Sequence, residues 1–419
     1  MERILTSIDV GTSKVCTMVA RMEGGDIVEV LGTGVVTSHG IQKAIVLDIT
    51  EPTIAIRNSV EEAERSSGIK IESAYIGITG SHVKSFNNQA TIDITRGNHL
   101  ITRKDIEKVI KASKGVSLVE DRQIIHAIPR RYRVDGQVVP ARPEGLHGYR
   151  LGVETHIITA GITFIQNLVK CVQGAGVGVM DLIMEPLASS EAVLEAAEKE
   201  QGVILADIGA GTTDITVFKE RDIWHSSALP VAGTEVTRDI AIGLGLPFNI
   251  AEELKVKYGS VTPNKKGVPD VISVNPDGKY GVSYQDFCYI IRARLEEIIK
   301  LLFVNLPRGE WETWEPGNLV FTGGASNVRG IEALGKEILG IPVRVGRPIG
   351  LPEEAAILDN PAYSTGVGLL LWGARYGATE DTTAEGAMTR FYSGLRRIWA
   401  RPELRRLWAN LPRFRIARR

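Results

Sequence analysis

The sequence predicts an α/β protein with a duplicated core, an inserted α+β unit and a C-terminal amphipathic helical tail. Strand-like alternation and helix-like periodicity follow one another through most of its 419 residues, as is typical of α/β folds. An unusual hairpin, a strand followed by Asp-x-Gly and a second strand, occurs near the N-terminus and again at residues 205–218. A polar run of small residues, 378–387, then leads to an arginine-rich end. These observations predict a repeated core, a linker and a tail.

The composition is that of a globular protein of roughly two to four domains, with 43% hydrophobic and 24% charged residues. The formal net charge of -1 hides a basic end, because residues 388–419 contain ten arginines and one glutamate. The cysteines, Cys16, Cys171 and Cys288, lie far apart and predict no disulfide framework. The sequence has no signal-peptide pattern and no apolar run near the roughly 18 residues of a spanning helix. We therefore expect a cytoplasmic protein.

The first part of the chain is predicted to continue from its hairpin into a strand, a helix and a further strand. An alternating run at residues 26–36 predicts the strand. A helix is expected at 51–68, with Pro52 near its start and Gly68 at its end. The apolar run at 73–80 predicts the next strand, which ends on glycine.

The pattern of predicted elements changes between residues 82 and 160, where short strands surround a capped helix that begins at Thr102. This region is expected to be an inserted α+β unit. Afterwards the α/β pattern resumes with a helix at 164–176, a strand at 177–186, a helix at 187–202, the second hairpin, a mostly helical region with a loop near 262–281, a strand with a glycine cluster at 318–339 and a last helix at 362–377.

These elements predict the following division of the chain. We expect a first core subdomain (1–81 and 161–198), the inserted unit (82–160), a second core subdomain (199–232 and 303–377), a helical subdomain that covers a ligand and binds a partner (233–302), a linker (378–387) and a basic amphipathic tail (388–419).

The two hairpins carry the residue types that bind phosphate. Glycine lets backbone N–H groups approach an anion, and hydroxyl and lysine side chains add donors. An aspartate at such a turn suits a hydrated Mg²⁺. Two turns that face each other would hold a triphosphate from both sides, although each alone could be an ordinary glycine turn. The expected residues are Asp9, Gly11, Thr12, Ser13 and Lys14 in the first hairpin, and Asp207, Gly209, Gly211, Thr212 and Thr213 in the second.

A third glycine cluster, at Gly323 and Gly324, follows a strand and opens a helix. Such backbone can pack against a flat ligand such as adenine and its ribose. The hairpins are not a P-loop, because a strand follows the glycines and the sequence has no GxxxxGK[ST] motif.

In this order, the three motifs resemble the superfamily of actin, the heat-shock chaperones and the sugar kinases, and most closely the FtsA family of bacterial cell-division proteins. The resemblance covers residues 1 to about 377 and the basic end. It implies an actin-like duplicated fold that binds ATP with Mg²⁺. One departure is Ala325, where a third glycine is expected.

The resemblance also implies roles for single residues. Glu185 would position the attacking water, although an acid at a helix N-terminus is also favoured by the helix dipole. Asp9 and Asp207 would hold the metal, and Lys14 would neutralise the phosphates. The segment "AEELKVKYG" is similar to one that contacts the nucleoside, or it is an ordinary solvated helix face; the expected ligands are Gly233, Glu253 and Lys257, near the charged residues Glu252 and Lys255.

The implied partners are those of cell division. The helical subdomain would bind the C-terminal peptide of the tubulin-like protein FtsZ through a cation on helix 284–302, with Arg294 the chosen residue beside Arg292 and Lys300. The inserted unit would mediate self-association into filaments, other division proteins could bind, and hydrolysis of ATP would be weak or regulatory. A pilus-assembly adaptor or a small-molecule kinase shares the core, but a kinase leaves the tail without a role. A chaperone would need a further β domain.

The tail is expected to lie on an anionic membrane at the division site. Apolar side chains follow helical spacing while arginines fill the other positions, and Pro402 should divide the segment into two short helices. Such helices bury their apolar side in the headgroup boundary. One alternative is a helix that docks on protein. Another is a tail that binds nucleic acid, although nucleic acid is not among the expected partners. The membrane residues are Phe391, Leu395, Trp399, Leu404, Trp408 and Leu411.

Overall fold

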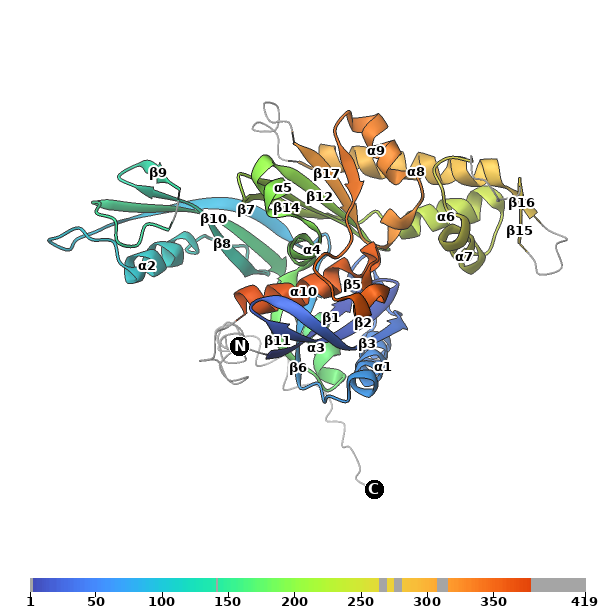
Figure 1. Cartoon of the computed structure of the whole chain (residues 1–419), viewed down its shortest axis with the longest axis horizontal. Helices are drawn as coiled ribbons and strands as arrows, with labels where there is room; N and C mark the ends of the chain where they lie inside the picture. The colour runs from blue at the N-terminus through green and yellow to red at the C-terminus, as the bar shows by residue number, and fades with distance from the viewer. Residues whose placement is uncertain (1–2, 141, 264–269, 275–280, 307–315, 378–419) are drawn as a thin grey trace, which may run out of the picture.

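The computed structural model describes residues 3–140, 142–263, 270–274, 281–306 and 316–377. In these ranges two central five-stranded sheets lie one above the other in Figure 1, with the inserted unit on one side and the helical subdomain on the other. The linker, the tail and its six expected membrane residues lie outside the described residues. Within the described ranges, no helix combines the length and apolarity needed to cross a bilayer.

The first sheet has the strand order β11-β6-β1-β2-β3. Its hairpin continues into a third antiparallel strand, and two parallel strands follow on the other side of β1. The bounds are β1 (Arg3–Val10), β2 (Lys14–Glu23), β3 (Asp26–Thr37), β6 (Ser73–Ile78) and β11 (Gly178–Met184).

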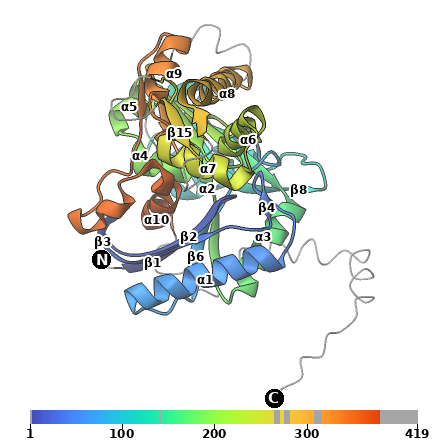
Figure 2. The ribbon, with the colours of Figure 1, turned by 90° about the vertical axis from the view of Figure 1, so that its right-hand side faces the viewer.

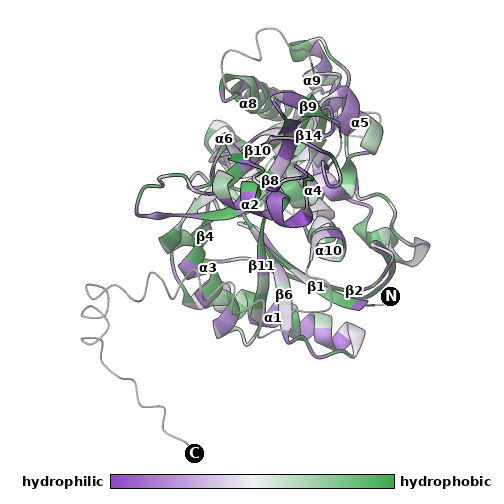
Figure 3. Cartoon of the chain, turned by 90° about the vertical axis from the view of Figure 1, so that its left-hand side faces the viewer, coloured by the Kyte–Doolittle hydropathy of each residue, from purple (hydrophilic) through white to green (hydrophobic). Residues whose placement is uncertain are grey.

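Helices cover both faces of this sheet. Helix α1 (Thr50–Ser67) lies on one face and α10 (Ser364–Tyr376) on the other, as Figure 2 shows. The alternating colours of α1 in Figure 3 reflect its single buried side. It ends at Gly68, whose φ of 70° favours glycine. Helix α3 (Ile162–Gly174) packs beside α1.

The second sheet repeats this topology in the order β14-β13-β12-β17-β18. A three-stranded antiparallel part is again followed by two parallel strands. The duplication expected from the hairpins therefore extends to a whole sheet. The bounds are β12 (Val203–Ile208), β13 (Thr213–Lys219), β14 (Asp222–Leu229), β17 (Asn318–Thr322) and β18 (Val343–Val345).

Two details differ from the sequence expectation. The single helix expected at 187–202 is two helices, α4 (Glu185–Val193) and α5 (Ala196–Gln201). The chain is extended between them because Glu195 begins a new helix, and its backbone N–H donates to Glu198 Oε2 at 2.9 Å. The last helix, α10, packs on β1, β6 and α4 of the first half rather than within the second subdomain.

The inserted unit has a four-stranded sheet and a small core of its own. Its helix α2 (Arg103–Ser113) has a capping box at Thr102, as the sequence predicts. The sheet also contacts β14 of the second half, where Ser85 Oγ donates to Ser226 O at 2.7 Å. Its strands are β7 (Lys84–Asp93), β10 (Arg150–Gly161), β8 (Arg122–Val134) and β9 (Gln137–Val139).

The helical subdomain shares a core with the second sheet. The expected loop near 262–281 contains β15 (Val271–Ser273), which pairs with β16 (Gly281–Ser283). A smaller pair, β4 (Ile41–Gln42) and β5 (Ile45–Val46), follows β3 and was not expected either. The helices of the subdomain are α6 (Gly233–Leu244), α7 (Phe248–Tyr258) and α8 (Tyr284–Val304); α9 (Ile331–Leu339) follows the glycine cluster.

Candidate functional site

A cavity of about 520 Å³ lies where the two halves meet, a volume within the usual range of small-molecule sites. Both hairpin turns, the glycine cluster and the first residue of α4 contribute to its lining. Most of the residues expected from the sequence are brought together there: Asp9, Gly11, Thr12, Ser13, Lys14, Glu185, Asp207, Gly209, Gly211, Thr212, Gly233, Gly323, Gly324 and Ala325.

Three expected residues do not line this cavity. Thr213 is buried in β13, where its hydroxyl donates to Val231 O at 2.7 Å. Glu253 and Lys257 lie on α7 but are not part of the lining, and the Lys257 ammonium lies over the ring of Tyr258.

The two turns have matching backbones. Gly11 N donates to Lys14 O at 3.0 Å, and Gly209 N donates to Thr212 O at 2.9 Å. The turns also touch each other, since a Cβ added at Gly211 would lie only 2.4 Å from Thr12 Oγ1. Glycine at this position therefore lets the two halves approach closely.

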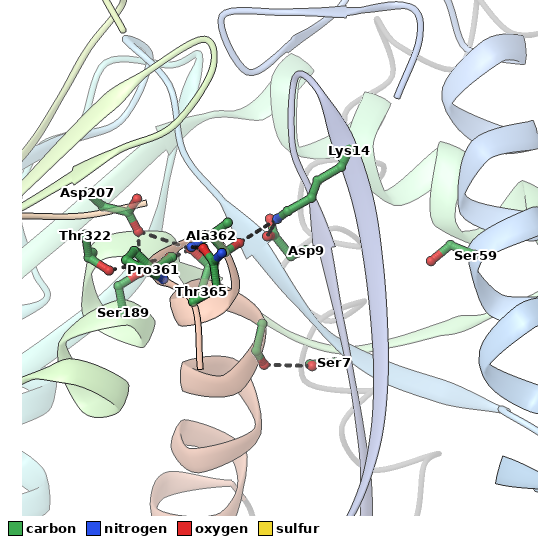
Figure 4. A network of polar contacts seen from close by, with 12 residues as sticks. Ser7, Asp9, Lys14, Ser59, Ser189, Asp207, Thr322, Pro361, Ala362 and Thr365 are labelled. Atoms are coloured by element: carbon green, nitrogen blue, oxygen red, sulfur yellow. Dashed lines mark hydrogen bonds and ion pairs between the residues drawn. The ribbon is translucent and has the colours of Figure 1, made fainter. Parts of the chain in front are cut away.

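Lys14 is held in a fixed position at the edge of the cavity. Its Nζ donates to Ala362 O at 2.7 Å and lies 3.5 Å from Asp9 Oδ2, as Figure 4 shows. Burial lowers the pKa of Lys14, but nearby negative charge, chiefly Asp9, raises the pKa more, so its net shift is upward. Lys14 therefore supplies a permanent positive charge.

Asp207 is held by hydroxyl groups from two helices. Ser189 Oγ donates to Asp207 Oδ2 at 2.5 Å, and Thr365 Oγ1 donates to the same oxygen at 3.2 Å (Figure 4). Burial raises the pKa of Asp207 to about 6. A Cβ added at Gly323, whose φ is 84°, would lie 2.3 Å from Asp207 Oδ1, so this glycine leaves room for the carboxylate.

Two further acids lie near Asp207. Glu185 is the first residue of α4, and burial, followed by the charges of Asp9 and other acids, raises its pKa well above the usual value. Asp214 lies opposite Asp207 in the hairpin register. Burial raises the pKa of Asp214 to about 7, although hydroxyl groups of Thr79 and Thr212 donate to it.

Sequence reasoning missed Asp214 as a site residue. Its signal was the alternation of the hairpin: two residues after Thr212, the chain returns to the position across from Asp207. Within the described part of the chain, no group of three His, Cys, Asp or Glu side chains is arranged to hold a metal ion alone.

Helix α7 also contributes to the cavity lining. Lys255 Nζ donates to Gly233 O at 3.1 Å, to Thr237 Oγ1 at 2.8 Å and to Glu252 Oε2 at 2.7 Å. Glu252, Lys255 and Val256 line the cavity because residues three and four positions apart share a helix face. Glu253 and Lys257 are also one helical turn apart, so spacing alone could not have selected Glu252 and Lys255 over them.

Arg294 lies on α8, outside the cavity lining. Its Nε donates to Asp239 Oδ2 at 2.6 Å, and a second guanidinium nitrogen bonds Glu297. These acids, first Asp239, raise the pKa of Arg294. Arg292 and Lys300 also pair with acids, so all three cations considered on this helix have intramolecular partners.

Comparison with known proteins identifies the family. A family model described as "Cell division protein FtsA" matches residues 204–368, and a second, "SHS2 domain inserted in FTSA", matches 80–159. Cell division protein FtsA of Pseudomonas aeruginosa is 36% identical over 374 residues, which cover 88% of this chain and 89% of that protein. The chain belongs to the FtsA family. FtsA of Escherichia coli is 29% identical over 414 residues, covering 96% of this chain and 98% of the relative.

Solved structures of other proteins have a fold similar to that of this chain. A PilM–PilN type IV pilus biogenesis complex contains a chain with a TM-score of 0.62 and 17% identity, covering 88% of this chain and 98% of that one. MreB5 of Spiroplasma citri bound to ADP has a TM-score of 0.50 and 13% identity, covering 88% and 96%. At these identities the likeness concerns the fold alone. The predicted actin-like fold with an inserted α+β unit is confirmed, and the family model describes that unit as an SHS2 domain.

Proposed function

We propose that this FtsA-family chain binds ATP with Mg²⁺ between its two halves and, as a membrane-bound filament, tethers the FtsZ ring to the cytoplasmic face of the cell membrane. The proposal rests chiefly on the two Asp-x-Gly turns, which touch each other and line one cavity. Membership of the FtsA family supports the role in division.

The phosphate groups of ATP fit the end of the cavity where the turns meet. Thr12, Ser13 and Thr212 offer hydroxyl groups there, and the backbone near Gly11 and Gly209 is accessible without side chains. Lys14 adds a positive charge that needs no reorganisation, because its ammonium is already fixed by Ala362 O. The purine and ribose would lie toward Glu252, Lys255 and the glycine cluster.

The same cavity suits a magnesium ion. Asp207, Asp214 and Glu185 have raised pKa values because burial and mutual repulsion penalise their charged forms. A divalent cation would relieve both penalties and favour ionisation. Asp9 and Asp207 would hold it together with water and phosphate oxygens, since Mg²⁺ commonly keeps several waters. When bound, the ion would neutralise charge on the phosphates.

Binding is tested by titrating the full chain with a fluorescent ATP in the presence of Mg²⁺. Asp207→Ala and Gly324→Asp should each reduce the affinity at least tenfold, because one removes a carboxylate and the other adds a charged side chain to the cavity. Asp93→Ala and Gly97→Asp are matched controls on the inserted unit, where Asp93 is exposed and Gly97 has open space around it. Equal affinity in all five proteins would contradict the site.

Hydrolysis is a separate part of the proposal. Glu185 lies at the cavity with its carboxyl buried, and a metal nearby would lower its pKa so that it can orient a water molecule. Phosphate release should fall about tenfold or more in Glu185→Ala while ATP affinity changes little. An unchanged release rate would remove Glu185 from this role.

The FtsZ peptide is proposed to bind the helical subdomain. Arg294 can engage an acidic peptide only if that peptide replaces Asp239 or Glu297 as its partner. Arg294→Glu should therefore weaken binding of the FtsZ C-terminal peptide in an anisotropy titration. Arg292→Glu, on the same helix and paired with Glu296 and Glu337, is the matched control. Equal loss in both variants would argue for a general charge effect.

Membrane attachment and assembly complete the proposal. The apolar and basic pattern of 388–419 should bind anionic vesicles and release them as salt is raised. A double Trp399→Glu, Trp408→Glu variant should remain in the supernatant after centrifugation with vesicles, and vesicles of neutral lipid are the control for charge. Pelleting of the chain with and without ATP tests filament formation. Sedimentation of the double variant like the wild type would contradict the anchor.

A further inference from the structure

The short hairpin β4–β5 connects its strands by a two-residue turn, Lys43–Ala44, in an unusual conformation. The φ angles are 51° at Lys43 and 60° at Ala44. Both central residues of such a turn need positive φ, and Asn-Gly or Gly-Gly is the usual choice. Neither Lys nor Ala adopts this conformation readily, so the surrounding contacts must hold the turn in place.

Those contacts come from both halves of the molecule. A Cβ added at Gly211 of the second hairpin would lie 3.0 Å from both the backbone N and the Cα of Lys43. Ala44 lines the cavity, and its N–H lies 3.5 Å from Thr12 Oγ1 of the first hairpin. The Lys43–Ala44 turn therefore packs against the contact between the two hairpin turns.

The Lys43 side chain extends this contact to a third element. Its Nζ lies 3.2 Å from Oε1 of Glu235, in the first turn of α6. Glu235 is fixed in turn, because its Oε2 accepts from Ala232 N at 3.0 Å. Arg238 lies 3.6 Å from the same Oε1 but belongs to α6 itself. Of these two ion pairs of Glu235, the one with Lys43 connects the first half of the molecule to the second.

We propose that the Lys43–Ala44 turn is a strap that fastens the two halves at the phosphate end of the cavity, and that Lys43 is a positioning residue that slows the release of bound nucleotide. This inference rests on the proposed ATP site. Lys43 acts through Glu235 and through the packing on Gly211, not through contact with the ligand: Ala44 lines the cavity, whereas Lys43 does not.

The test uses the full chain loaded with a ribose-labelled fluorescent ATP and chased with excess ATP. Lys43→Met keeps the length of the side chain but removes its charge, and should increase the dissociation rate about two- to fivefold, the range expected for a partly exposed ion pair. Added salt should accelerate release from the wild type more than from the variant. Lys70→Met, which removes an exposed cation paired with Glu64 on the first half, should leave the rate unchanged.

A second measurement needs no nucleotide. Amide hydrogen exchange at residues 41–46 and at the start of α6 should be faster in Lys43→Met than in the wild type, and unchanged in Lys70→Met. Equal exchange would overturn the strap as a fastening contact, and equal dissociation rates would overturn its effect on release. If the wild type binds no fluorescent ATP, the proposed function fails instead, and the exchange measurement still reports on the contact.

Discussion

Hairpins β1–β2 and β12–β13 can be compared position by position, because each pairs its aspartate with a residue of the second strand. Asp9 lies opposite Cys16, whereas Asp207 lies opposite Asp214. Lys14 in the first hairpin corresponds to Thr212 in the second. The same backbone turn therefore carries one acid and one cation in the first half, and two acids and a hydroxyl in the second.

This difference separates two tasks that a triphosphate with a metal requires. The first hairpin offers a fixed cation to an anion, and burial raises the pKa of its Cys16 thiol to about 12, so the residue opposite Asp9 stays neutral. The second hairpin offers carboxylates whose raised pKa values favour a cation as a partner. A duplicated fold can thus acquire complementary charges by changes at two equivalent positions.

The largest expected effect comes from making the first hairpin like the second. Cys16→Asp would place a carboxylate opposite Asp9 in a fully buried position, and should lower the free energy of unfolding at pH 8 by about 3 kcal/mol or more. Urea denaturation measures this change. Cys16→Ser, which buries only a hydroxyl, should cost about 1 kcal/mol. Equal stability of wild type and Cys16→Asp would show that the two positions are not distinguished by charge.

The next effect concerns the cation of the first hairpin. Lys14→Met should weaken ATP binding about ten- to a hundredfold, because a desolvated charge pair is lost. Lys14→Arg keeps the charge and should retain more of the affinity. A fluorescent ATP titration compares the three proteins, and the prediction fails if Lys14→Met binds as tightly as the wild type.

The third effect is a pH dependence of the second hairpin. The folded-state pKa of Asp214, about 7, lies above the ordinary value of 3.8, so the folded state is favoured at low pH and loses this stability as pH rises through 7. Without metal or nucleotide, the stability of Asp214→Asn relative to the wild type should therefore increase as the pH is raised from 5 to 8. The expected increase in this difference is on the order of 2 kcal/mol. Thermal unfolding at both pH values measures it, with Asp93→Asn as an exposed control. A gain that is the same at pH 5 and pH 8 would contradict the raised pKa.

The smallest effect is the release of a proton on binding. Mg²⁺ and ATP should shift Asp207 and Asp214 toward their ionised forms, so binding at pH 6.5 should release up to roughly one proton and binding at pH 8.5 much less. Calorimetry in two buffers with different ionisation enthalpies gives this number. Release that does not change with pH would separate these carboxylates from the ligand.

The fold was largely predictable because it depends on local signals. The two hairpins, the capped helix after Thr102 and the end of α1 at Gly68 each follow from a few neighbouring residues. The break between α4 and α5 has one local signal, the bond from the Glu195 N–H to Glu198. A second contact could not be predicted in this way, because Arg344, which is distant in sequence, donates to both Val193 O and the carboxylate of Glu198.

The candidate site was only partly predictable from such local signals. The glycines and aspartates of the hairpin turns can be identified by residue type and spacing, and the structure brings them together. The choice of Glu252 and Lys255 instead of Glu253 and Lys257 depends on how α7 is rotated against the cavity. Four charged residues within six positions do not fix that rotation. The strap at Lys43 depends on a contact between distant segments and has no local signal.

Helix α10 bears on how the chain can be synthesised and folded. Gly366 packs against Met18, Gly373 packs against Tyr75, and Ser7 Oγ donates to Gly366 O at 2.8 Å across 359 positions (Figure 4). Strands β1 and β2 are therefore synthesised long before α10, and their sheet is covered on both faces only after α10 has been made. Until residue 376 has been added, the nascent chain presents an apolar surface around Met18, and its earliest-made half is completed last.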